Sequence, residues 1–249
     1  METEETLQTA PPPAVPRKSW IDRIQALIEV LLLAGLMSSI LAALPFALRP
    51  NGREHLLGDV RMMAGYILLE AIITLLLLFL VLKAHGETLA SLGIHWNQWR
   101  TNVLLGLATV LVLFVLNYII SLIFQFYLPR YYLERNPLTD LIRTPKDLLL
   151  FIGTALIAGG FKEEFQRAFI LRRFQAYLGG AQVGLVLWSV VFGFGHYIQG
   201  AQGVVTAGLF GMIFGILYLM RGSLVAPIVA HGIYDTLALL GYWFLSSHK

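Results

Sequence analysis

The chain has 249 residues, of which 57% are hydrophobic and 13% are charged, about half the share of charge in an average soluble domain. Its mean hydropathy of +0.71 therefore indicates a polytopic membrane protein. The net charge of +3 does not indicate nucleic-acid binding, because the basic residues stand singly between apolar runs and form no basic stripe. The absence of cysteine excludes disulfides, thiolate nucleophiles and thiolate metal sites.

The N-terminal segment METEETLQTAPPPAVP is acidic and proline-rich. It lacks the basic start and apolar middle of a cleaved signal peptide. We therefore expect a disordered tail over residues 1–20, with the first spanning helix acting as an uncleaved signal. The rest of the chain shows no repeat of fixed period and no second domain.

Apolar runs follow one another along the rest of the chain. One crossing of a hydrocarbon core of roughly 30 Å needs roughly 20 helical residues, whereas a barrel strand needs only about 10. The length of the runs thus predicts an all-α membrane helix bundle with about seven transmembrane helices. The first three runs form a predicted scaffold (residues 21–146) and the last four a predicted catalytic half (residues 147–249). The runs cover about residues 24–48, 62–82, 103–128, 148–171, 183–198, 204–220 and 224–245.

Charge does not predict the orientation of these helices. An excess of Lys and Arg is expected on the cytoplasmic side, but these residues divide equally between the two sides of the predicted bundle. The small size and the short links favour a multi-pass protein of a bacterial inner membrane, in contact with lipids.

The fourth run contains charged residues in its body, within the stretch GGFKEEFQRAFILRR. A charged side chain at the bilayer centre costs about 2.5–3.5 kcal/mol even on the mildest scale, so a functional site is the default interpretation. Residues four apart share a face of a helix, as Glu163 and Arg167 do, and Glu164 lies three residues from the arginine. In the simplest arrangement one glutamate is held ionised by Arg167, while the other faces a water molecule.

Two later runs also contain polar residues. Phe192 and His196 are four residues apart, as are His231 and Asp235, and His196 and His231 are the two histidines that fall within predicted spans. We predict that these motifs and the fourth run meet in one buried polar site. A carboxylate and two imidazoles in an apolar surround suit the activation of water for attack on a carbonyl group.

The three motifs resemble those of the CAAX-protease and bacteriocin-processing (CPBP) family of intramembrane endopeptidases, also called the abortive-infection family, which includes the type II CAAX prenyl endopeptidase. The resemblance covers about residues 147–245. In that family a Glu-Glu-x3-Arg motif, a Phe-x3-His motif and a His-x3-Asn/Asp motif lie on successive helices. The corresponding residues here are Glu163 and Glu164 with Arg167, Phe192 with His196, and His231 with Asp235.

The first motif departs from the family pattern, because two residues instead of three separate Glu164 from Arg167. When the motif is aligned on the arginine, Lys162 takes the place of the family's first glutamate. When it is aligned on the carboxylates, Glu163 does. We favour Glu163 as the residue that activates water, because it shares a face with Arg167 and occupies a motif position in both alignments.

The resemblance implies a glutamate-dependent endopeptidase that acts on a peptide or protein substrate, which is a prenylated tail for the eukaryotic relatives. Glu163 with His196 would polarise water, and His231 with Asp235 would bind the substrate carbonyl or stabilise its oxyanion. Members are often labelled metalloproteases, and a zinc ion is the cofactor alternative, although no His-Glu-x-x-His pair is present. The predicted catalytic residues are Glu163, Glu164, His196, His231 and Asp235, supported by Arg167 and Phe192, and the zinc ligands would be Glu163, His196, His231 and Asp235.

Two other functions stay open. One is a non-proteolytic family member that acts in immunity or as a membrane scaffold, and the other is a proton-coupled carrier with Glu163, His196 and Asp235 as its relay. Many carriers are built from repeated halves, and no such repeat is evident here. Glu70 also lies within a predicted span, but no motif surrounds it, so we interpret it as a packing or water-facing residue.

Overall fold

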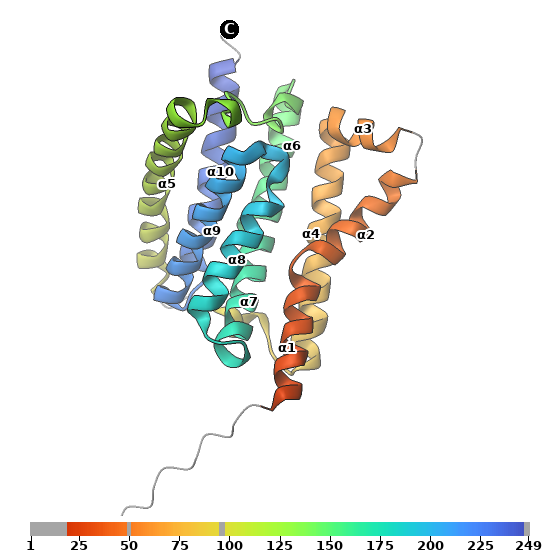
Figure 1. Ribbon diagram of the computed structural model, residues 1–249, viewed down its shortest axis with the longest axis vertical. Coiled ribbons are helices and arrows are strands. Elements are labelled where there is room, and N and C mark those ends of the chain that lie inside the picture. Colours follow the sequence, from red (N-terminus) through yellow and green to blue (C-terminus); the bar gives the residue numbers. More distant parts are fainter. Residues whose placement is uncertain (1–18, 49–50, 95–97, 247–249) are drawn as a thin grey trace, which may run out of the picture.

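The structure is a computed structural model of the chain, which describes residues 19–48, 51–94 and 98–246. All regular secondary structure in this part is helical, which confirms the predicted all-α membrane bundle (Figure 1). The predicted tail lies outside the described residues, apart from its last two positions. The α-helices are α1 (Trp20–Leu33), α2 (Leu36–Ala47), α3 (Gly52–Gly58), α4 (Val60–Ala84), α5 (Trp99–Tyr127), α6 (Pro145–Ala155), α7 (Glu164–Tyr177), α8 (Ala181–Gly195), α9 (Gly200–Arg221) and α10 (Val225–Ser246).

Shorter elements connect these helices. A π-helix, η4 (Leu156–Glu163), joins α6 to α7 without a break, so the three form one helical rod. The remaining elements are 3₁₀ turns in the links, namely η1 (Leu89–Leu92), η2 (Pro129–Tyr131), η3 (Thr139–Leu141) and η5 (Tyr197–Gln199).

Each of the seven predicted spans coincides with helical structure. Within the described residues five stretches are long and apolar enough to cross a membrane, and α8 is a shorter apolar helix. The rod of α6, η4 and α7 accounts for the remaining span. The chain is therefore an integral membrane protein. The five long stretches are Trp20–Ala47, Val60–Ala84, Trp99–Tyr127, Tyr197–Arg221 and Val225–Leu245.

The first span is broken into α1 and α2 and is not the continuous helix that its apolar run predicts. Gly35, between the two, has a φ of 96°, in the left-handed region that glycine adopts without steric cost. A break inside the bilayer must satisfy its backbone groups within the protein. Gln166 of α7 donates a hydrogen bond to the Leu33 carbonyl, and the Ser39 backbone amide donates one to the Gly35 carbonyl.

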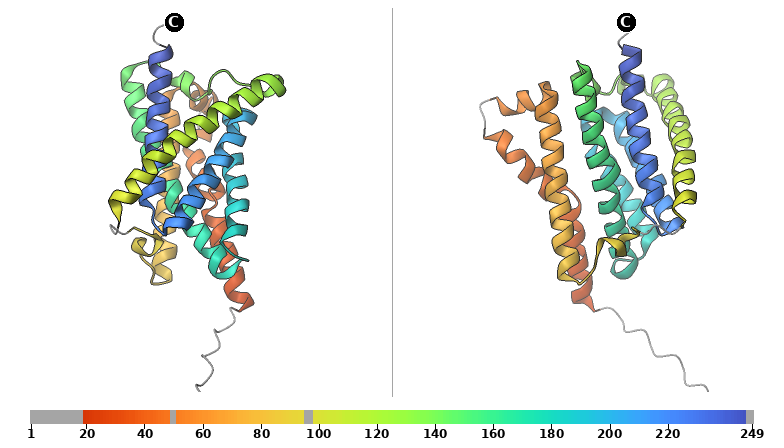
Figure 2. Two further views of the ribbon diagram at one scale, coloured as in Figure 1. Left: turned by 90° about the vertical axis from the view of Figure 1, so that its left-hand side faces the viewer. Right: turned by 180° about the vertical axis from the view of Figure 1, so that it is seen from behind.

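The helices form two groups with α7 between them. In Figure 1, α1 to α4 lie on one side and α5, α9 and α10 on the other. Figure 2 shows α5 slanting across the bundle, where it packs on α9 and α10, and α4, α6 and α10 lying in a row when seen from behind. Three apolar clusters join the helices, the first around Phe169, the second around Leu113 and Phe214, and the third around Met63 and Phe151.

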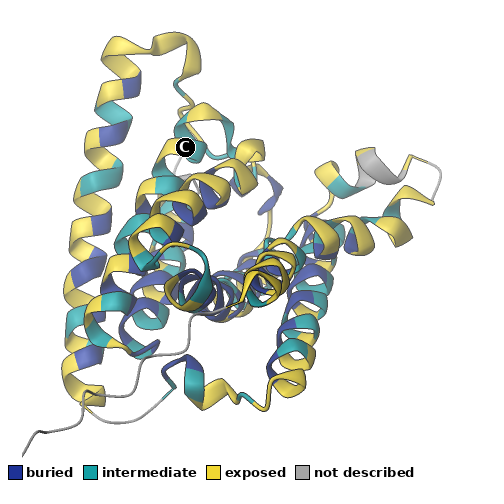
Figure 3. Cartoon of the chain, turned by 60° about the horizontal axis from the view of Figure 1, so that its bottom comes forward, coloured by how far each residue is buried: buried dark blue, intermediate teal, exposed yellow. Residues whose placement is uncertain are grey.

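Burial follows this arrangement. The outer faces of the helices are exposed, as a lipid-facing surface requires, while the inner faces are buried (Figure 3). Helix α7 contacts α1, α4, α8 and α9, and its residues from Glu164 to Leu171 are all buried. Glu164 and Arg167, which lie in this stretch, are thereby shielded from lipid.

Candidate active site

The site begins at the π-helix η4, where the rod passes closest to α10. π-Helical turns are rare and are frequent at functional sites. Gly159 of η4 has no side chain, and a Cβ atom added there would lie 2.8 Å from Asp235 Oδ2 and 3.1 Å from His231 Nε2. At the neighbouring Gly160, an added Cβ atom would lie 3.5 Å from the Cα atom of Gly232 in α10. The two glycines therefore allow α10 to place His231 and Asp235 directly against η4.

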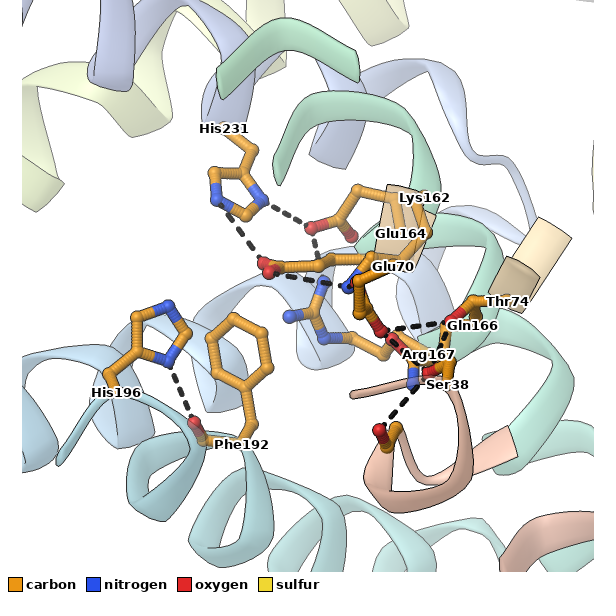
Figure 4. A network of polar contacts seen from close by, with 12 residues as sticks. Ser38, Glu70, Thr74, Lys162, Glu164, Gln166, Arg167, Phe192, His196 and His231 are labelled. Carbon is orange, nitrogen blue, oxygen red and sulfur yellow. Dashed lines mark hydrogen bonds and ion pairs between the residues drawn. The ribbon is translucent and has the colours of Figure 1, made fainter. Parts of the chain in front are cut away.

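Glu164 holds His231 in one orientation. Glu164 is 1% exposed and Arg167 is fully buried, and the two form an ion pair across one helical turn. The Nδ1 atom of His231 lies 2.8 Å from Glu164 Oε1 (Figure 4). Because an ionised carboxylate only accepts hydrogen bonds, Nδ1 carries the proton and donates. The other ring nitrogen, Nε2, lies 3.8 Å from Glu163 Oε2 and 3.5 Å from Asp235 Oδ2.

Aromatic rings from α8 and α9 complete the support of these groups. The Arg167 guanidinium lies over the rings of Phe192 and Phe214, at 4.8 Å and 5.4 Å from the ring centroids. The His231 ring stacks on Phe214, with 4.6 Å between centroids and 18° between planes. The His196 ring packs against Phe192 at 4.7 Å, and its Nδ1 donates a 2.8 Å hydrogen bond to the Phe192 carbonyl. Phe192 thus connects the arginine on α7 to the histidine at the end of α8.

A cavity of about 510 Å³ opens beside these residues, a volume typical of ligand sites. Four of the predicted catalytic residues line it, and Glu164 does not. Amide and hydroxyl side chains also line it, including Asn117 and Ser121 of α5, which the family resemblance does not cover. The predicted catalytic residues in its wall are Glu163, His196, His231 and Asp235.

The two adjacent glutamates have different surroundings. Glu164 pairs with Arg167 and His231 behind the cavity wall, whereas Glu163 faces the cavity. Glu163 Oε2 is buried and accepts no hydrogen bond from the described residues. The reason for favouring Glu163, its shared face with Arg167, is wrong, because the arginine pairs with Glu164. Helical spacing allows the arginine to reach either carboxylate, and stacking on Phe192 and Phe214 directs it to the second.

The described side chains do not form a metal site. Among them, no three His, Asp or Glu residues are grouped closely enough to hold a metal ion. The Nδ1 atom of His231 is engaged by Glu164, and the Lys162 ammonium lies 3.9 Å from Glu163. The zinc alternative, with Glu163, His196, His231 and Asp235 as ligands, therefore does not fit this arrangement.

Two buried polar clusters beside the site were not predicted. In the first, Lys162 forms an ion pair with Glu70 of α4. In the second, at the far end of α7, Arg173 binds Glu29 and Glu87. From the sequence one can predict only that Glu70 lies within a span. Its pairing with Lys162 could not be predicted, because the two residues are far apart in the sequence.

Comparison with known proteins identifies the family of this part of the chain. Residues 144–237 match the family model described as type II CAAX prenyl endopeptidase Rce1-like. The match spans all three motifs and starts at Thr144, whose side chain caps α6. The match confirms the resemblance to this family over residues 144–237, which is less than half of the chain. Helices α1 to α5 lie outside the match. The comparisons with curated proteins and with solved structures found no match.

Proposed function

We propose that the protein is an intramembrane endopeptidase that hydrolyses a peptide bond with a water molecule activated by Glu163 and His196. One observation carries this proposal. Glu163 Oε2 is a buried carboxylate oxygen without a hydrogen bond from the described residues, at the wall of a cavity that His196, His231 and Asp235 also line. Buried polar atoms are nearly always bonded, so a water molecule or a substrate group is the natural partner of this oxygen.

Proton transfer would follow from the bonding of the two side chains. His196 donates through Nδ1 to the Phe192 carbonyl, so Nε2 of the neutral ring is free to accept from water. The water gives a proton to Glu163 as its oxygen bonds to the substrate carbonyl carbon, and the carbonyl electron pair moves to oxygen. When the carbonyl re-forms and the C–N bond breaks, Glu163 returns the proton to the leaving nitrogen. General acid–base catalysis of this kind contributes about 10²–10⁴-fold.

The oxyanion formed in the first step needs a hydrogen-bond donor. His231 Nε2 points to the cavity side, because Glu164 holds Nδ1 on the other side of the ring. When Nε2 also carries a proton, it can donate to the oxyanion, and Asp235 at 3.5 Å orients and balances the charged ring. Removal of one such donor typically lowers turnover by about 10²–10³-fold.

The proposed substrate is a membrane-associated peptide segment, and lipid-modified tails like those cleaved by the eukaryotic relatives are the first candidates. Asn117, Gln199 and Gln202 line the cavity, and their amide groups can both donate to and accept from a peptide backbone. We further propose a bacterial inner membrane as the location.

Cleavage of a fluorogenic peptide library by the purified protein in detergent tests this proposal. Glu163→Gln and His196→Asn should each lower kcat by at least about 10²-fold while the protein stays folded. Glu29→Gln is the matched control, because Glu29 is a buried carboxylate remote from the cavity. Undiminished cleavage by Glu163→Gln would contradict the proposed role. Absence of cleavage by the wild type, together with pH-dependent uptake into vesicles, would favour a carrier.

A further inference from the structure

Glu70 of α4 is fully engaged inside the protein, although no sequence motif surrounds it. Lys162 Nζ lies 2.8 Å from Glu70 Oε2, and both residues are buried, at 7% and 8% exposure. The hydroxyl groups of Ser38 and Thr74 donate to Glu70 Oε1 at 2.8 Å and 2.9 Å (Figure 4). Both oxygens of the Glu70 carboxylate therefore have partners. Because Glu70 belongs to α4, its ion pair with Lys162 joins the group of helices α1 to α4 to η4.

The break between α1 and α2 lies beside the Glu70 carboxylate that binds Lys162. A Cβ atom at Gly35 would lie 3.9 Å from Glu70 Oε1 and 3.6 Å from Gln166 Nε2. Gln166, at the start of α7, also donates to the Leu33 carbonyl at the end of α1. The N-terminal helices thus bind the rod at Lys162 and at Gln166, which lie on either side of Glu163 in the sequence, although these helices lie outside the family match.

Lys162 lies between two carboxylates and bonds to only one of them. Its contact of 2.8 Å with Glu70 is a charge-assisted hydrogen bond, whereas 3.9 Å to Glu163 Oε1 is too long for one. The other charged and titratable groups near Glu163 are His231, at 3.8 Å, and beyond it Glu164 and Asp235.

A lysine next to the proposed catalytic carboxylate would pair with it and block it unless another group binds the lysine ammonium. Lys162 stands where the family's first glutamate falls in the alignment on Arg167, so this chain places a cation beside the site. Without Glu70, the nearest carboxylate for the Lys162 ammonium would be Glu163 itself. A direct ion pair would then occupy the oxygen atoms that a water molecule needs.

We propose that Glu70 and Lys162 are positioning residues for Glu163: Glu70 binds the Lys162 ammonium and so keeps it from pairing with the Glu163 carboxylate. This inference rests on the proposed function. It makes the N-terminal helices, which the family match does not cover, a part of the catalytic machinery.

Kinetics of three variants test the proposal, namely Glu70→Gln, Lys162→Met and the two combined. Glu70→Gln keeps the shape and frees the lysine to pair with Glu163, so kcat should fall by about tenfold to a hundredfold with little change in KM. The combined variant leaves neither charge buried alone, so its thermal unfolding should be close to that of the wild type. Its kcat should also return towards the wild-type value, because no ammonium remains to pair with Glu163.

Glu29→Gln serves as the matched control. Glu29 is as buried as Glu70 and belongs to the same group of helices, but its partners, Arg173 and His85, do not contact Glu163. This variant should lose stability and keep the wild-type kcat and pH profile. If Glu70→Gln keeps the wild-type kcat, or if the combined variant is as slow as Glu70→Gln, the pair does not act by keeping the ammonium away from Glu163, and the proposal is overturned.

Solid-state NMR gives a readout that needs no turnover. With isotope-labelled lysine and glutamate, the ammonium–carboxyl coupling that Lys162→Met removes should join Lys162 to Glu70 in the wild type. In Glu70→Gln it should instead join Lys162 to Glu163. Absence of that second coupling would overturn the inference even if the wild type cleaves peptides. Its appearance would support the inference even if the natural reaction proves to be a different one.

Discussion

The two ends of α7 each bury an arginine among carboxylates, but they differ in how fully the charges are bonded. At the far end, Arg173 donates to Glu29 and to Glu87, each at 2.7 Å, and His85 lies 2.6 Å from Glu29. At the near end, Glu163 Oε2, Glu164 Oε2 and the Nε and Nη2 atoms of Arg167 are buried without hydrogen-bond partners among the described residues. Similar residues on one helix thus form two different kinds of cluster.

The difference indicates which cluster is structural. A buried polar atom without a partner costs free energy, and such atoms in a native protein call for an explanation. Glu163, whose Oε2 atom is unpaired, lines the large cavity with the two histidines. The Arg173 cluster has its carboxylates paired and joins α1 and the η1 link to α7. Arg173 Nη2 is also buried without a partner among the described residues, and Arg173 and Glu87 line a second cavity. An unpaired carboxylate oxygen on a residue of the cavity wall therefore distinguishes the near end.

The largest expected effect separates the two adjacent glutamates. Glu164→Gln leaves the Arg167 guanidinium buried without its counter-ion, which should lower the free energy of unfolding by about 3–5 kcal/mol. Glu163→Gln changes an oxygen that has no partner, so the change should be below about 1 kcal/mol. Thermal unfolding of both variants in the same detergent measures the difference. Equal destabilisation would show that the two carboxylates are not divided as described.

Breaking the far cluster should affect stability alone. Arg173→Met leaves the buried Glu29 with His85 and the uncharged Gln25 as partners, and the expected loss is about 3 kcal/mol of unfolding free energy. The folded fraction should hydrolyse peptide with unchanged kcat, because no residue of this cluster lines the cavity. Turnover and unfolding measured on one preparation check both points. A fall in kcat per folded molecule would remove the contrast between the two ends.

A methyl group at the closest approach of η4 and α10 should affect turnover more than stability. Gly159→Ala places a Cβ atom between Asp235 and His231 and should displace them by several tenths of an ångström. A loss of about 10²-fold in kcat is expected from such a displacement, which corresponds to about 2.7 kcal/mol of activation free energy. Gly153→Ala, on the same rod, meets no atom within 4 Å and is the control. Equal kcat values for the two variants would contradict the proposed geometry.

Helix positions could be predicted from the sequence, because the bilayer requires apolar runs of a set length and the spans from α4 to α10 have them. The three motifs also identify the family and the side chains that meet at the cavity. The break at Gly35 could not be predicted, because an apolar run does not reveal whether its backbone bonds are satisfied by another helix. The pairing of Arg167 with Glu164 depends on rings from α8 and α9, and the Lys162–Glu70 pair joins segments far apart in the sequence. Spacing along one helix contains none of this information.

The smallest expected effects come from replacing the aromatic rings that pack on the two arginines. Arg167 lies 4.8 Å from the ring centroid of Phe192, and Arg173 lies 4.5 Å from that of Phe169. Replacing either ring with leucine removes a buried cation–π contact worth about 1–2 kcal/mol, so Phe192→Leu and Phe169→Leu should lose similar stability. Only Phe192 also packs on His196 and lines the cavity, so only Phe192→Leu should reduce kcat, by about tenfold or less for a ring shifted without loss of its bond to the backbone. A kcat that falls equally in both variants would mean that the two ends of α7 move as one unit, and that the Arg173 cluster is itself needed to hold the proposed catalytic residues in place.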